Sequence, residues 1–98
     1  MSGEIRTLPV RAQLVDDVDR DGTPAGGFEF FTSGGRPEAG MLFRCPCGCG
    51  KLQSLDFRPH DSPSWEWDGN RDAPTLQPSV HMVGHWHGWL RAGIWESV

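Results

Sequence analysis

The sequence predicts an all-β domain with little or no helix, built as a small and mostly antiparallel sheet or sandwich. Apolar and polar side chains alternate in several short segments, which is the period of a half-buried strand. No segment shows convincing helical periodicity, and prolines exclude helix from residues 74–83. At 98 residues the chain predicts a single domain, 1–98, with residues 1–6 as a flexible arm.

The expected strands are short, and they cover residues 7–15, 27–32, 41–44, 51–57, 65–68, 74–83, 85–90 and 93–95. The first of them alternates apolar and polar residues, and Pro9 makes it an edge strand because proline cannot donate a ladder hydrogen bond. The second places Phe28 and Phe30 on one face. A turn at residues 33–37 leads from this strand to the next.

Residues 41–44 and 51–57 flank the cysteines, and we expect them to form a hairpin that carries the cysteines at its tip. The strand at 65–68 points two indoles to one side. The last two strands form a second hairpin that turns at Ala92 and Gly93. The five tryptophans are interpreted as core or sheet cover rather than a binding platform, and they are Trp65, Trp67, Trp86, Trp89 and Trp95.

All three cysteines of the chain fall within five residues, at Cys45, Cys47 and Cys49. A disulfide explains this cluster poorly, because bridging residues two or four apart closes a strained ring and leaves one thiol unpaired. Thiolates suit Zn²⁺, and the intervening Pro and Gly allow a tight turn. The cluster therefore predicts a zinc knuckle.

A structural zinc site needs four protein ligands, so at least one more donor is expected. His81, His85 and His87 lie within seven residues, and on one extended strand all three would point to the same face. His60 lies outside this group. The preferred fourth ligand is His87, with His85 next. The predicted metal site is thus drawn from Cys45, Cys47, Cys49, His87 and His85, and it holds one Zn²⁺ per chain.

Asp17, Asp19 and Asp21 precede Gly22 and form the opening of a calcium-binding loop, D-x-D-x-D-G. The match ends there, because the twelfth position holds Phe28 instead of a bidentate Glu. We therefore interpret the segment as an acidic turn, and Ca²⁺ is the less favoured alternative.

The formal net charge of -4 argues against a basic nucleic-acid-binding face, since the nine Lys and Arg are spread along the chain. No apolar run has the length of a membrane span, and no leader follows Met1. Reducing conditions, which keep thiols available for metal, are expected.

Four motifs occur in order between Phe43 and Trp95, and they are CPCGCG, WEWDGN, PTLQPS and HGWLRAGIW. In this order they resemble a family of small Cys/His proteins of unknown function, common in tailed phages and prophages and sometimes found in bacterial operons of ubiquitin-like conjugation components. The resemblance implies zinc binding through the three cysteines and His87. Gly84 stands where relatives carry a further Cys, so either His85 substitutes or the site has fewer ligands.

The function first expected is non-enzymatic: a zinc-stabilised phage-type module that binds a virion protein or a host protein, in the host cytoplasm or the virion. A closed ligand set leaves no open position for substrate. One alternative is a zinc hydrolase that uses His81, His85 and His87, with a nearby carboxylate as base. Another is a module that stacks single-stranded nucleic acid on its indoles.

Overall fold

The computed structural model describes residues 4–98, which form nine short strands and no helix. The predicted all-β fold is therefore confirmed. The strands are β1 (Val10–Arg11), β2 (Phe28–Ser33), β3 (Arg36–Arg44), β4 (Leu52–Asp56), β5 (Glu66–Trp67), β6 (Leu76–Gln77), β7 (Val80–Met82), β8 (Trp86–Arg91) and β9 (Ile94–Ser97). Within this range no helix is long and apolar enough to cross a membrane.

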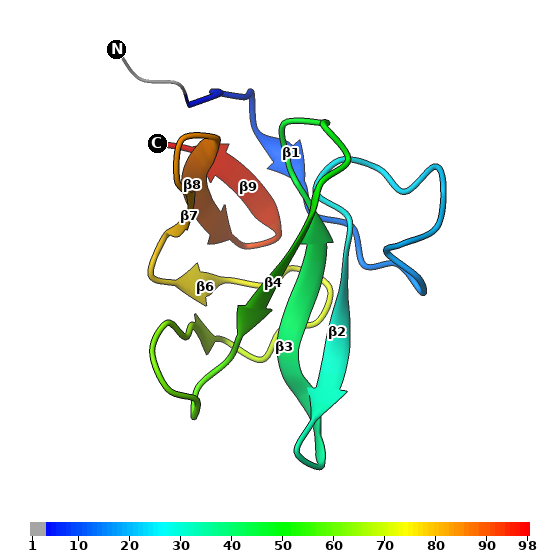
Figure 1. Cartoon of the computed structure of the whole chain (residues 1–98), viewed down its shortest axis with the longest axis vertical. Helices are drawn as coiled ribbons and strands as arrows, with labels where there is room; N and C mark the ends of the chain where they lie inside the picture. The colour runs from blue at the N-terminus through cyan, green and yellow to red at the C-terminus, as the bar shows by residue number, and fades with distance from the viewer. Residues whose placement is uncertain (1–3) are drawn as a thin grey trace.

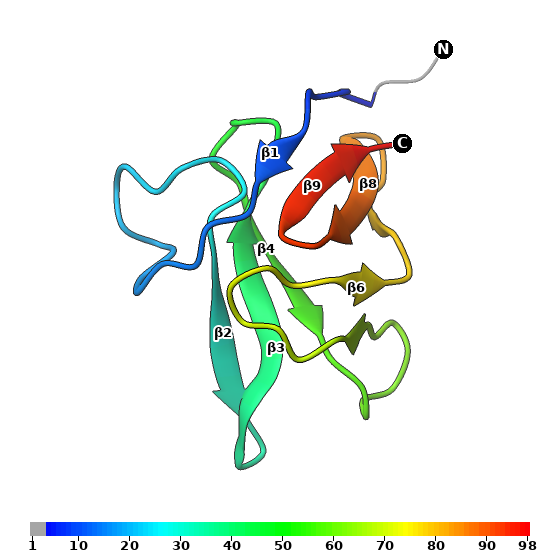
Figure 2. The same ribbon diagram turned by 180° about the vertical axis from the view of Figure 1, so that it is seen from behind.

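The strands form three antiparallel sheets (Figure 1). One has the order β2-β3-β4, the second β1-β9-β8-β7, and the third is the pair β5-β6. Seen from behind, β6 lies between the β2-β3-β4 sheet and the β8-β9 hairpin (Figure 2). The short β5-β6 pair thus joins the two larger sheets on one side of the molecule.

Aromatic rings fill the space between the two larger sheets. Phe43 of β3 stacks on Trp95 of β9 with ring centroids 4.7 Å apart, and Trp86 of β8 meets Trp95 edge to face at 5.8 Å. All three side chains are fully buried. Trp86 and Trp95 are therefore core residues, as predicted, and burial on this scale is the main favourable term in the folding of so small a domain.

The N-terminal segment pairs less than its pattern predicts. Of residues 7–15 only Val10 and Arg11 form a strand, which lies at a sheet edge as expected, and Leu8 is 85% exposed. Pro9 has no N–H to donate, which limits the ladder on β9. Residues 1–3 of the expected arm lie outside the described residues, but Ile5 donates a backbone hydrogen bond of 2.6 Å to His85 O.

Two other strand boundaries differ from the predicted ones for local reasons. The β2–β3 turn is confined to Gly34 and Gly35, both at positive φ, so β3 begins at Arg36 instead of residue 41. The extended segment 74–83 divides into β6 and β7 around Pro78, which cannot take part in a ladder.

Replacing Gly88 with Ala should lower the free energy of unfolding by about 3 kcal/mol, because a buried Cβ has no room in β8. It would lie 2.3 Å from both the Glu96 carbonyl oxygen and the Trp86 ring. Urea unfolding measures the loss. The control is Gly22→Ala, where a Cβ meets nothing within 4 Å and only backbone strain of about 1 kcal/mol is expected. Equal losses in the two variants would contradict this packing.

Candidate functional site

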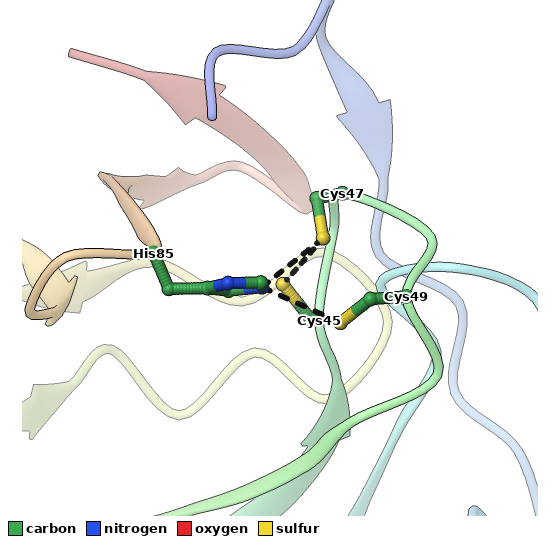
Figure 3. Close-up of side chains that lie close together, drawn as sticks. All are labelled: Cys45, Cys47, Cys49 and His85. Atoms are coloured by element: carbon green, nitrogen blue, oxygen red, sulfur yellow. Dashed lines mark hydrogen bonds between the residues drawn. The ribbon is translucent and has the colours of Figure 1, made fainter. Parts of the chain in front are cut away.

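The cysteines occupy the tip of the β3–β4 hairpin, as predicted. Cys45 N–H donates to Lys51 O at 2.9 Å, and Gly48 N–H donates to Cys45 O at 3.1 Å. Gly48 and Gly50 adopt positive φ, which glycine tolerates without strain. The tight loop turns the three thiols toward one point (Figure 3).

His85 approaches the thiols from the other sheet (Figure 3). It ends the turn between β7 and β8, where its N–H donates to Met82 O at 2.8 Å. Its Nε2 lies 3.2 Å from Cys47 Sγ and 3.4 Å from Cys49 Sγ, and the Cys45 and Cys47 sulfurs are 3.2 Å apart. The hairpin tip and the β7–β8 turn therefore meet at a single cluster.

The four donor atoms of Cys45, Cys47, Cys49 and His85 lie within 4.8 Å of one another. A tetrahedral zinc ion has Zn–S distances of about 2.3 Å and Zn–N distances of about 2.0 Å, so its ligand atoms lie roughly 3.6 Å apart. The cluster is compatible with one zinc ion.

Cys45 and Cys49 differ in acidity, for different physical reasons. Desolvation by burial raises the pKa of Cys45 to about 12. The backbone N–H of Lys51 donates to Cys49 Sγ at 3.4 Å and lowers the pKa of Cys49 to about 7. Cys49 is thus ionised more easily than Cys45.

A second cluster lies on the outer face of the β7–β8 ribbon. His81 and His87 are paired across the two strands, and their rings stack with centroids 4.2 Å apart. His81 Nε2 lies 2.5 Å from Glu4 Oε2, and His87 Nε2 lies 2.9 Å from Ser79 Oγ. One donor atom each from Glu4, His81 and His87 lie within 4.8 Å of one another.

Ser79 is held in place by its backbone. It immediately precedes β7, and its carbonyl oxygen accepts a hydrogen bond of 3.2 Å from Trp65 Nε1. Ser79 and His87 are both half-buried, so the pair is shielded from bulk water but accessible. Sequence reasoning missed Ser79. The available signal was its spacing of two residues from His81, which places both side chains on one face of an extended segment.

The structure separates the predicted ligands. Cys45, Cys47, Cys49 and His85 come together, whereas His87, the preferred fourth ligand, belongs to the second cluster. The proposed trio of His81, His85 and His87 is wrong, because the turn before β8 sends His85 to the cysteines. Among residues 4–98, Asp17, Asp19 and Asp21 do not form a group of ligand atoms, and Asp19 instead faces Arg44 at 3.9 Å.

The molecule is thus a small all-β protein with a Cys₃His cluster and a separate serine–histidine pair. A family model matches residues 15–98, and the chain belongs to that family, BubE, described as the bacterial ubiquitination-like system serine protease. Comparisons with curated proteins and with solved structures give no match.

The family overturns the first expectation of function. A non-enzymatic phage-type module does not agree with a family described as a protease. The closed Cys₃His set, which suggested such a module, lies in a separate cluster from the serine–histidine pair. The resemblance to proteins found beside ubiquitin-like conjugation components agrees with the family description, which makes no mention of phage.

In protein treated with a chelator at pH 7, iodoacetamide should modify Cys49 first and Cys45 last. Cys49 is exposed with a pKa of about 7, and Cys45 is buried with a pKa of about 12, so their thiolate fractions differ widely. Peptide mapping by mass spectrometry gives the order. Urea-unfolded protein is the control, in which the order should disappear. Equal rates in the folded protein would contradict the described geometry.

Proposed function

We propose that this protein is a serine protease in which Ser79 is the nucleophile and His87 the general base. The observation that supports this most directly is the 2.9 Å separation of Ser79 Oγ and His87 Nε2, which is the reach that a nucleophile and its base require. Membership of the BubE family supports the same reaction class. The family description assigns such a protease to a bacterial ubiquitination-like system, and we infer that the substrate is a protein of that system.

The reaction follows from this pair. Ser79 Oγ attacks the scissile carbonyl carbon while His87 Nε2 takes the hydroxyl proton, and the tetrahedral intermediate then forms. As the C–N bond breaks, His87 returns the proton to the leaving amine and an acyl group remains on Ser79 Oγ. Water, deprotonated by His87, hydrolyses the ester and restores the hydroxyl. A positioned base of this kind contributes about 10²- to 10⁴-fold in rate.

Glu4 and His81 provide the electrostatic support. The hydrogen bond with His81 lowers the pKa of Glu4, and the neighbouring His87 acts in the same direction, so the carboxylate is ionised. Its negative charge favours the positive charge that His87 acquires during proton transfer. The stacked His81 ring limits the orientations open to His87.

The Cys₃His cluster is proposed to hold one structural Zn²⁺. Three thiolates and an imidazole form a closed set with no position for water or substrate, so this metal would stabilise the fold and take no part in the reaction. It would tie the β3–β4 hairpin to the β7–β8 turn at His85, two residues before His87. A metal at Cys45, Cys47, Cys49 and His85 would therefore fix the start of the strand that carries the base.

A fluorophosphonate probe should form one adduct per chain on Ser79, without any need to know the substrate. Ser79→Ala should abolish labelling, and His87→Gln should slow it by at least about 100-fold because Oγ loses its base. Intact mass and peptide mapping measure both. Ser54→Ala, an exposed serine on β4, should label normally. Labelling at another serine, or unchanged labelling in His87→Gln, would contradict the assignment.

Purified protein should contain one zinc per chain and should unfold at a lower urea concentration when a strong chelator removes it. Cys47→Ser should lower the zinc content, whereas His81→Gln should retain it, because His81 lies in the other cluster. Elemental analysis and circular dichroism measure the two effects. Two zinc ions per chain, one of them lost in His81→Gln, would instead place a metal beside Ser79 and oppose a serine mechanism.

A further inference from the structure

A large hollow lies beside the Ser79–His87 pair. Along β8, Trp86, Gly88 and Leu90 are buried, so the intervening residues His87, Trp89 and Arg91 share the outer face. The hollow has a volume of about 710 Å³, and its lining is Arg58, Thr75, Leu76, Gln77, Pro78, Trp89, Arg91 and Ala92. Neither Ser79 nor His87 lines the hollow itself, but Pro78 directly precedes Ser79, and Trp89 shares the outer face of β8 with His87.

The walls of the hollow are fixed by the fold. Ala92 N–H donates to Thr75 Oγ1 at 2.8 Å, and Gly93 N–H donates to Pro74 O at 2.9 Å. These bonds join the β8–β9 turn to the segment that leads into β6. The volume falls in the range of roughly 300–1,000 Å³ that is usual for ligand sites. The hollow is therefore a preformed cleft.

Its charge is positive although the chain as a whole carries -4. Arg58 and Arg91 line the hollow, and no Asp or Glu does. Within residues 4–98 neither guanidinium makes an ion pair; Arg91 instead lies over the Trp89 ring at 4.3 Å. A planar guanidinium held against a ring is well suited to bind a carboxylate with two hydrogen bonds.

Three acidic residues lie near the positive hollow but do not line it. Glu66 and Asp68 line a different hollow together with Gln77 of β6. Glu96 is paired with Trp89 across β8 and β9 but does not line the positive hollow. The two hollows share Thr75 and Gln77, but within the described residues none of these acids makes an ion pair with Arg58 or Arg91.

We propose that this hollow is the substrate subsite of the protease and that it takes a peptide residue bearing a carboxylate, next to the scissile bond. The proposal rests on the proposed function, since it uses Ser79 as the point of cleavage. Leu76, Pro78 and Trp89 would contact the apolar part of the peptide, and Arg58 and Arg91 would bind the carboxylate.

The first test compares cleavage of two randomised peptide libraries that differ only in a fixed Glu or its neutral counterpart Gln, placed at each position around the cleaved bond. Wild-type protein should cleave the Glu library roughly 10-fold faster at one position, because a charge-assisted pair is formed there. The double variant Arg58→Gln, Arg91→Gln should lose this preference, so that it cleaves the Glu and Gln libraries at equal rates. Arg20→Gln, an exposed arginine outside the hollow, should keep it.

Cleavage without a preference for Glu, or a preference that survives in the double variant, would overturn the proposal. Absence of cleavage in every library would count against the proposed protease function, and the hollow is then judged by binding. The probe is a short acetylated and amidated peptide that alternates Gly and Glu, and the readout is the NMR signal of the Trp89 indole N–H, assigned with Trp89→Phe.

The Glu peptide should shift this indole signal, and its Gln counterpart should not. A Gln peptide with a free terminal carboxylate distinguishes the two sources of the charge: a shift with this peptide alone would mean that the hollow takes a chain end and would overturn the side-chain assignment. No shift with any of these peptides would overturn the site altogether.

Discussion

The alternation of β8 is the constraint on which both sites depend. Trp86, Gly88 and Leu90 must face the core, since Trp86 completes the aromatic layer and Gly88 has no room for a side chain. His87 is therefore directed outward, and pairing with β7 brings it beside His81 and near Ser79. A register slip of one residue would bury the imidazole and expose the indole. The cost of burying a charged or unpaired ring fixes the register, and with it the candidate nucleophile–base geometry.

The Cys₃His cluster supplies the second constraint, at the other end of the same turn. A domain of this size buries a limited share of its surface, so a metal that bridges two sheets would contribute much of its stability. Cys45 is itself part of the hydrophobic core, whereas Cys49 is exposed. The cluster thus extends from the core to the surface, and His85 connects it to β8. In the proposed function, His85 would hold the metal that stabilises the fold, and His87, two residues later, would act as the base.

Much of this arrangement could be predicted from the sequence, and the limits have physical causes. The hairpin around the cysteines and the turn at Ala92 and Gly93 depend on local signals, namely alternation and glycine, and both were predicted. His85 and His87 could not be told apart, because residues two apart point to the same face of any extended strand. Gly84, at positive φ in the turn, separates them by ending β7 before His85. Ser79 could not be singled out, because lying on the same face as His81 does not show that it meets His87, eight positions away.

The central claim is that His87 acts as the base for Ser79, and the pH dependence of fluorophosphonate labelling tests it most directly. The rate should rise as His87 loses its proton and then level off, with a midpoint equal to the His87 pKa measured by NMR on the same protein. A labelling rate that rises steadily with hydroxide concentration, or a midpoint that differs from the His87 titration, would contradict the account.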